Sequence, residues 1–276
     1  MSCAIEEAPR TASALFAAMR RRDGQWSSVD DVLAEEVPVA LEYNGVSHAV
    51  MLATPADLAE FALGFSLSEG IIDTPRQCYG IELEHGATGI TAHIDIAAGA
   101  FARLKERRRT LAGRTGCGLC GVDSLDQVLR PLAYLAPTRA LSAAAIRTAL
   151  EQLTAHQPIN RSTGAMHAAL WCGRDGAPRL AFEDVGRHNA LDKLIGGLHA
   201  QQADLADGFA LITSRASVEM VQKAATVGIA ALVAISAPTA LAARAAQACG
   251  LTLVAFARGG GFTAYAHAIN IAADAP

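Results

Sequence analysis

The chain has 276 residues, of which 51% are hydrophobic and 18% charged, with a formal net charge of −4. This length suggests one or two domains with a well-buried core, and we expect two. The acidic balance gives no general attraction to nucleic acid or to an anionic membrane, and no apolar run reaches the roughly 18 residues of a membrane span. Because the start has no basic segment followed by an apolar stretch, we expect a cytoplasmic protein.

The N-terminal part of the chain is predicted to be a loose segment followed by a small α+β domain. Residues 1–28 mix arginine, alanine and serine with little periodicity beyond a possible short helix over 12–21. The small domain is expected over residues 29–130. It begins with apolar and polar runs on either side of Asn44-Gly45, a dipeptide typical of a hairpin turn. The further elements expected in it are a helix over 54–69, which starts at Thr54 and Pro55, and a strand pair over 81–84 and 89–96.

Residues 131–276 are predicted to form a second domain in which strands and helices alternate. After a hairpin, single helices separate short, continuously apolar strands, a pattern typical of a parallel sheet covered on both faces. Gly228 and Gly250 are placed to end two of the helices. The expected strands are 166–172, 178–182, 209–213, 231–235 and 251–257, and the expected helices are 187–202, 218–228 and 238–249.

Two of the six cysteines form a glycine-rich CxxC motif. The irregular spacing of the six does not suggest a disulfide framework, and Cys172 and Cys249 in apolar surroundings are expected to be packing residues. Cys117 and Cys120 differ, because glycines at 116, 118 and 121 leave both sulfurs on bendable backbone. Arginines at 107, 108, 109 and 114 lie just upstream, and positive charge lowers the pKa of a nearby thiol. The pattern therefore predicts a reactive thiol pair.

Other uses of a CxxC motif fit less well. A structural zinc site needs four ligands, and the sequence has no second CxxC or HxxxH at a suitable spacing. Zinc nucleobase deaminases have HxE before PCxxC, whereas His93-Ile94-Asp95 has aspartate in place of glutamate. A thioredoxin-type motif follows a strand of a βαβ unit, not an arginine-rich segment. We favour thiol chemistry and keep a domain stabilised by a structural zinc ion as an alternative.

Polar and basic residues follow three predicted parallel strands, the place where open α/β sheets bind ligands. The first strand is followed by Ser214, Arg215 and Ser217, the second by residues 236–239 and the third by residues 258–261. Hydroxyls at helix starts, arginines and a glycine run together predict an anion site suited to phosphate. The alternative is that the hydroxyls at 217 and 239 are ordinary helix caps and the glycines an ordinary turn.

The predicted strand-to-helix turn at 183–189 concentrates acids, an arginine, an imidazole and an amide. His188 at a helix start would have its pKa lowered by the helix dipole, and could orient a ligand or transfer a proton. The alternative is that Asp184 caps the helix while Arg187 and His188 are solvated. His167, on an apolar strand, is expected to be a core histidine.

Taken together, these motifs resemble the FdhD family of sulfur carriers, which are accessory proteins of formate dehydrogenase. The similarity runs from about Glu36 to Tyr265. Ala53, Ala165 and Thr263-Ala264 depart from residues that are common in the family. The matching motifs are 44–45, 51–55, 64–72, 117–121, 163–167, 183–193, 214–217 and 256–259.

The resemblance implies that Cys117 accepts sulfur from a cysteine desulfurase as a persulfide, with Cys120 as the second loop cysteine. It implies delivery of this sulfur to the molybdenum of a bis(molybdopterin guanine dinucleotide) cofactor, carried as cargo before insertion into formate dehydrogenase. In fold it implies a small α+β domain and a cytidine-deaminase-like α/β/α sandwich without the catalytic zinc, assembled as a homodimer. The family's cofactor segment corresponds to Phe256, Ala257, Arg258, Gly259, Gly260 and Gly261, and the strand ends add Ser214, Arg215, Ser217 and His188.

A second hypothesis is a molybdenum-cofactor chaperone. Such a protein would bind the guanine nucleotide of the cofactor and use Cys117 and Cys120 structurally. Only the sulfur carrier needs a persulfide, so the chemical state of the thiols separates the two hypotheses.

Overall fold

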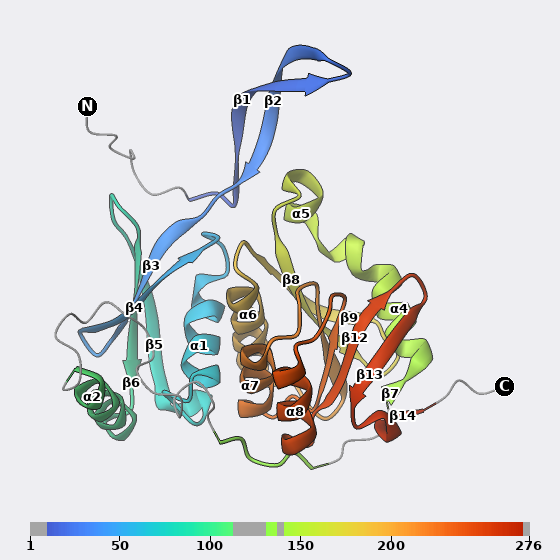
Figure 1. The fold of residues 1–276 in the computed structure, drawn as a ribbon. Coiled ribbons are helices and arrows are strands. Elements are labelled where there is room, and N and C mark those ends of the chain that lie inside the picture. Colours follow the sequence, from blue (N-terminus) through green and yellow to red (C-terminus); the bar gives the residue numbers. More distant parts are fainter. Residues whose placement is uncertain (1–9, 113–130, 137–140, 273–276) are drawn as a thin grey trace.

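Two sheets with helices packed between them form successive layers (Figure 1). The computed structural model describes residues 10–112, 131–136 and 141–272. A four-stranded sheet is followed by helix α1, by a helix group, by a six-stranded sheet and by helix α4 on the far face. This is the mixed α/β fold that the sequence predicts. The helices of these layers are α1 (Leu58–Ser68), α6 (Arg187–Ala200), α7 (Val218–Thr226), α8 (Ala240–Cys249) and α4 (Ala143–Gln152).

The four-stranded sheet has the order β4-β3-β6-β5. Both predicted strand pairs are present as antiparallel pairs, and the parallel pairing of β3 with β6 joins them. One face of the sheet is buried against α1, because alternate residues of β3 and β6 are apolar and point to the core. The strands are β3 (Val37–Tyr43), β4 (Val46–Ala53), β5 (Cys78–His85) and β6 (Ile90–Ile96).

Helix α1 begins later than predicted. The expected cap at Thr54 and first helical position at Pro55 are wrong, because the Thr54 hydroxyl accepts from the Val185 N–H and the Thr54 N–H donates to the Asp184 carboxylate. The backbone adopts a left-handed conformation at Asp57, with φ of 54°, and the helix starts at Leu58. The predicted end near Glu69 is confirmed, since Ser68 is the last helical residue.

The arginine-rich stretch before the cysteine motif belongs to a helix that the sequence analysis does not predict. Helix α2 (Ala98–Ala112) includes Arg107 and packs into the core through the buried side chains of Ala100 and Leu104. The run of arginines over 107–109 interrupts the apolar periodicity, to which Ala100, Phe101 and Leu104 contribute. A short 3-10 helix, η1 (Pro75–Gln77), lies between α1 and β5.

The prediction of a loose segment over 1–28 with a helix over 12–21 is wrong for the residues described. Residues from Ser13 onward form an antiparallel hairpin of β1 (Ser13–Arg22) and β2 (Gln25–Ala34), so the predicted boundary at 28/29 falls inside a strand. Cross-strand pairing overrides the helix propensity of the alanines and arginines. The missed signal is Asp23-Gly24, which turns the chain with φ of 49° and 82°.

The six-stranded sheet has the order β13-β12-β11-β10-β8-β9 and is mixed rather than wholly parallel. The predicted parallel run is confirmed for β10, β11 and β12, whereas β8, β9 and β13 pair antiparallel at its two sides. Helices cover both faces, as predicted. The strands are β8 (His167–Gly173), β9 (Pro178–Asp184), β10 (Gly208–Ile212), β11 (Ala231–Ala234), β12 (Thr252–Arg258) and β13 (Gly261–Ala266).

Several shorter elements complete the second half of the chain. Helix α4 and the short helix α5 (Pro158–Thr163) are not predicted from the sequence. The buried face of α4 consists of Ala145, Ile146 and Ala149, and α5 has only six residues, none of them buried. The remaining elements are the paired strands β7 (Leu141–Ser142) and β14 (Ile271–Ala272) and the 3-10 helices η2 (Leu153–His156) and η3 (Ala268–Asn270).

One hydrophobic core extends across both predicted domains. It includes Val39 of the four-stranded sheet, Phe61 of α1, Leu194 of α6 and Leu253 of the six-stranded sheet. The predicted division at residue 130 lies outside the described residues and stays a prediction. None of the helices in the described ranges is long and apolar enough to cross a membrane.

Helices α1 and α6 meet through glycines. A Cβ atom at position 64 would overlap the backbone carbonyl of Asp192, and one at position 196 would overlap that of Glu60. The two backbones therefore come closer together than any side chain would permit. This contact joins α1, which packs on the four-stranded sheet, to α6, which packs on the six-stranded sheet.

We predict that Gly64→Ala lowers the free energy of unfolding by about 1–3 kcal/mol, because the added methyl group forces the two helices apart. The measurement is chemical denaturation followed by circular dichroism. Gly99→Ala is the matched control, since a Cβ atom at position 99 in α2 meets nothing within 4 Å. Equal stability of the Gly64→Ala protein and the wild type would contradict the close approach.

Candidate functional site

The predicted strand-end residues gather at the carboxyl ends of the parallel strands in the six-stranded sheet. We call this end of the sheet the strand edge. Strands β10, β11 and β12 are parallel, so their carboxyl ends lie at the same edge. Backbone bonds then connect the three loops: Ala216 N–H donates to Ala237 O at 3.1 Å, and Phe256 N–H donates to Ser236 O at 3.1 Å. Antiparallel pairing brings the start of β8, at His167, and the end of β9, at Asp184, to the same edge. The predicted convergence is confirmed.

The glycine run turns the chain between β12 and β13. Gly259 and Gly260 have φ of 60° and 81°, so the interpretation as a turn is correct for this segment. The turn nevertheless lies at the predicted edge, and the exposed Arg258 precedes it. Ala257 is buried in the second core cluster, so its side chain faces away from any ligand at the surface.

Phe256 has an unusual backbone conformation at the end of β12. Its φ is 52°, in a region that bulky residues rarely adopt, and the register of β12 with β13 is irregular at this point. The residue is 39% exposed, and its ring lies 6.4 Å from the Tyr265 ring and has the Arg258 guanidinium 5.8 Å from its centroid. Strained residues of this kind concentrate at functional sites. The conformation presents an aromatic face and a cation together.

The hydroxyl groups at this edge have different roles. Thr239 is an ordinary cap, since its Oγ1 accepts from the Ala242 N–H at 3.1 Å. Ser217 makes no capping bond, and its Oγ lies 3.4 Å from Glu219 Oε2. Ser214 is buried and donates to the backbone carbonyl of Arg215. Of these three, Ser217 is the hydroxyl that remains available at a helix start.

A buried ion pair holds the turn at 183–189. Lys193 Nζ lies 2.7 Å from Asp184 Oδ2, and both side chains are fully buried. Asp184 also accepts from the backbone N–H of Thr54 and of Gly186 and from the side-chain amide of Asn189. The neighbouring Glu183 accepts from two backbone N–H groups at the start of α5. The acids of this turn are therefore structural, and Asp184 does more than cap a helix.

His188 lies beside Glu219 at the start of α6. Its Nε2 is 2.9 Å from Glu219 Oε2, which links α6 to the first turn of α7. Burial lowers the pKa of His188, the Arg187 charge adds to this effect, and Glu219 opposes it. The predicted direction is confirmed, although burial rather than the helix dipole is the main cause. His167 is half-buried at the start of β8, and burial lowers its pKa as well.

Arg187 is a half-buried arginine at this edge that forms no ion pair with any residue in the described ranges. Its Nε is buried and has no hydrogen-bond partner among the described residues, whereas the residue as a whole is half-buried, so Arg187 is only partly solvated. Arg187, Arg215 and Arg258 form no ion pair with any residue that the structure describes. A buried polar group without a partner is costly, so an anionic ligand would relieve it. Sequence reasoning selects His188 but not Arg187, and the available signal was its position next to that histidine.

The cysteine motif at Cys117 and Cys120 lies outside the described residues, so its position relative to this edge stays a prediction. Cys172 and Cys249 are buried packing residues, as predicted, and burial raises the pKa of Cys172 to about 12. No group of three or more His, Cys, Asp or Glu side chains suitable for a metal ion occurs within the described ranges. The zinc alternative depends on cysteines outside these ranges and stays open.

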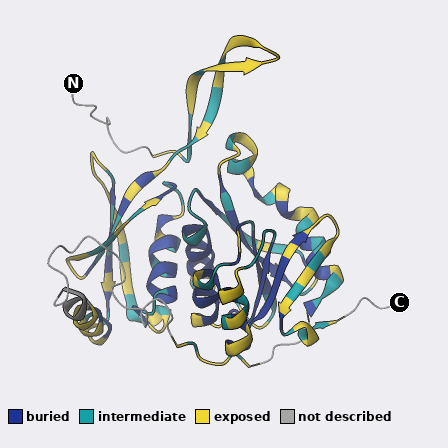
Figure 2. Ribbon diagram, in the orientation of Figure 1, coloured by how far each residue is buried: buried dark blue, intermediate teal, exposed yellow. Residues whose placement is uncertain are grey.

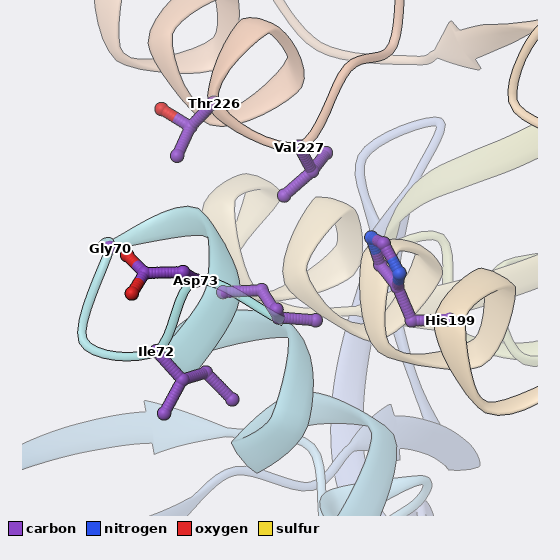
Figure 3. Close-up of a pocket in the computed structure, with 7 residues that line it drawn as sticks. Gly70, Ile72, Asp73, His199, Thr226 and Val227 are labelled. Atoms are coloured by element: carbon purple, nitrogen blue, oxygen red, sulfur yellow. The ribbon is translucent and has the colours of Figure 1, made fainter. Parts of the chain in front are cut away.

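A separate pocket of about 250 Å³ lies at the opposite ends of the helices (Figure 3). Helices α1, α6 and α7 end near it, and its lining includes Leu67, Asp73, His199 and Val227. None of the predicted site residues that the structure describes lines this pocket, and we take the strand edge as the candidate site.

Comparison with known proteins identifies the family. Residues 34–272 match the sequence model of the FdhD/NarQ family, which is most of the chain. The chain belongs to the FdhD/NarQ family. Two relatives are called sulfur carrier protein FdhD: one from Cupriavidus necator, 53% identical over 91% of this chain and 88% of its own length, and one from Variovorax paradoxus, 52% identical over 86% and 85%.

A solved structure shares the FdhD fold. It is described as that of a proposed formate dehydrogenase accessory protein from Desulfotalea psychrophila, and it superposes with a TM-score of 0.73 over 95% of this chain and all of its own. At 23% identity the likeness concerns the fold alone. The resemblance of the sequence motifs to the FdhD family is therefore confirmed, and the strand edge is a surface of an FdhD-type fold.

We predict that His188 titrates below its ordinary value of 6.5 and that Glu219→Gln lowers its pKa further, because the carboxylate favours the charged imidazole. The measurement is an NMR titration of the histidine side chains. The unfolded state binds this proton more readily, so the contribution of His188 to stability is lost as the pH falls from about 6.5 through the folded pKa. A His188 pKa above 6.5 would contradict the arrangement.

Proposed function

We propose that this protein is a sulfur carrier required for formate dehydrogenase activity, which accepts sulfur as a persulfide on Cys117 and delivers it to a guanine-nucleotide molybdenum cofactor. Membership of the FdhD/NarQ family and relatives of about 50% identity named sulfur carrier proteins support the sulfur carrier role. The observation in the structure that supports it best is the strand edge, where Arg187, Arg215 and Arg258 form no ion pair with the part of the chain that the structure describes and the Phe256 residue is exposed.

Sulfur acceptance needs a thiolate and an accessible donor. The Cys117 thiolate attacks the outer sulfur of a persulfide on a cysteine desulfurase, and a new S–S bond forms as the donor's S–S bond breaks. The desulfurase leaves as a thiolate, so no external oxidant or reductant is consumed. Arginines at the end of α2, among them Arg107, precede the motif in the chain and favour the thiolate form. Cys120 assists as the second cysteine of the loop.

The strand edge fits a nucleotide that carries phosphates. The partnerless Nε of Arg187 and the exposed guanidinium groups of Arg215 and Arg258 supply donors and charge for phosphate oxygens. Phe256 and Tyr265 supply aromatic faces for a base. The bound cofactor would supply the molybdenum that receives the sulfur, while these residues bind and orient its nucleotide end. The same edge would serve a chaperone, so only the thiol chemistry separates the two functions.

Three finer aspects belong to the proposal. The second half of the chain is a cytidine-deaminase-like sandwich that works without a catalytic zinc, since no deaminase chemistry is needed for sulfur transfer. The protein acts in the cytoplasm as a homodimer. Its protein partners are a cysteine desulfurase as donor and formate dehydrogenase as client.

The test of the sulfur carrier role is incubation of the full-length protein with a cysteine desulfurase and cysteine, followed by mass spectrometry. We expect one or more sulfur atoms on Cys117, and we expect Cys117→Ala to abolish both this adduct and activation of formate dehydrogenase. Cys78→Ala is the matched control, because Cys78 is a partly exposed cysteine outside the CxxC motif. Full activation by the Cys117→Ala protein would refute the sulfur carrier and favour the chaperone.

A further inference from the structure

The pocket on the far side of the molecule from the strand edge forms where three helices end. Leu67 lies in the last turn of α1, His199 lies in the last turn of α6, and Thr226 is the last residue of α7. Figure 3 shows Asp73 and His199 on opposite sides of the pocket, with Thr226 and Val227 above them. None of the lining residues belongs to the strand edge, so the inference drawn from this pocket goes beyond the proposed function and does not depend on it.

The helix ends give this pocket a negative character. The C-terminus of a helix carries partial negative charge, and the C-termini of α1, α6 and α7 meet here. Helices α1 and α6 are buried along most of their length (Figure 2), so solvent screens their charges less than those of a surface helix. The lysine of α7, Lys223, does not oppose this effect, because Asp192 and Glu69 neutralise its charge. A positively charged ligand is therefore favoured.

Three side chains of the pocket have polar atoms that no described residue binds. Asp73 Oδ2 accepts from Arg103 at 2.7 Å and from Gln77, whereas Asp73 Oδ1 has no partner in the described ranges. His199 Nε2 is buried and has no hydrogen-bond partner there. Burial lowers the pKa of His199, so its ring is neutral near pH 7 and one ring nitrogen can accept a hydrogen bond. The Thr226 hydroxyl also forms no hydrogen bond with this part of the chain.

Apolar side chains form the rest of the wall. Leu67 and Ile72 are buried, and Val227 is half-buried. The volume of about 250 Å³ lies just below the roughly 300–1,000 Å³ of pockets that hold drug-sized ligands. The pocket therefore suits a smaller molecule, with a short apolar part and a group that donates hydrogen bonds.

We propose that this pocket binds an organic ammonium group that carries a short apolar chain. An ammonium group has three donors and no acceptor, so it matches the free oxygens of Asp73 and Thr226 and the negative helix ends. The apolar chain then lies against Leu67, Ile72 and Val227. Two sources supply this chemistry: a free small amine and the lysine side chain of a partner protein.

NMR titration of the full-length protein with isopentylamine tests the site, and isopentanol is the uncharged counterpart. We expect a dissociation constant of about 1 mM or below for the amine. The alcohol should bind at least about fivefold more weakly, because it forms no charge-assisted hydrogen bond with Asp73. The His199 ring signals, assigned with His199→Gln, should shift as the amine is added. This comparison uses the wild type alone and does not depend on how any variant folds.

Asp73→Asn should weaken binding of isopentylamine at least about fivefold and leave binding of isopentanol unchanged, since only the amine uses the carboxylate charge. Glu151→Gln is the matched control, because it removes an exposed carboxylate on α4, on the far face of the six-stranded sheet (Figure 1). This control should bind the amine like the wild type, and circular dichroism should show both variants folded.

Titration with N-acetyl-lysine N-methylamide separates the two sources. Tighter binding than that of isopentylamine assigns the pocket to the lysine side chain of a partner protein, and equal or weaker binding assigns it to a free amine; both results support an ammonium site. An amine that binds no more tightly than the alcohol, unchanged amine affinity in Asp73→Asn, or His199 signals that do not move would each overturn the proposal.

Discussion

The buried ion pair between Lys193 and Asp184 is the constraint on which the candidate site depends. Two charges without solvent are tolerated only when their remaining hydrogen-bonding capacity is satisfied, and here Thr54, Gly186 and Asn189 satisfy the carboxylate. Thr54 comes from the first sheet and the other residues from the second half of the chain. The pair therefore joins the two halves and fixes the turn that presents Arg187 and His188 at the sheet edge.

A second cluster, in which a buried lysine again pairs with carboxylates, connects helices α1, α6 and α7. Lys223 of α7 lies 2.9 Å from carboxylate oxygens of Asp192 on α6 and of Glu69 after α1, and it also donates to Ser68. With the glycine contact between α1 and α6, these links hold the starts of α6 and α7 at one edge. The N-terminus of a helix carries partial positive charge. The starts of α6 and α7 therefore add to the positive charge of the arginines at the strand edge, and both favour an anion.

Elements that depend on neighbouring residues in the sequence can be predicted from it. The Asn44-Gly45 hairpin, the parallel strands β10 to β12 and the convergence of their ends follow from turn residues and apolar periodicity. What the sequence could not supply depends on distant contacts: α1 starts at Leu58 because Thr54 binds Asp184, and β1 is a strand because it pairs with β2. The environment of Arg187 cannot be predicted from the sequence for the same reason, since only the fold shows its Nε to be buried with no hydrogen-bond partner in the described ranges.

We propose that the guanine nucleotide of the cofactor binds at the strand edge through Arg187. Isothermal titration of the full-length protein with GDP tests it most directly, with Arg187→Gln as the variant and the exposed, distant Arg76→Gln as the control. The account predicts micromolar or tighter binding for the wild type and the control, and a loss of at least about tenfold for Arg187→Gln, because a charge-assisted phosphate contact is removed. Unchanged affinity in Arg187→Gln, or no binding of GDP by the wild type, would contradict it.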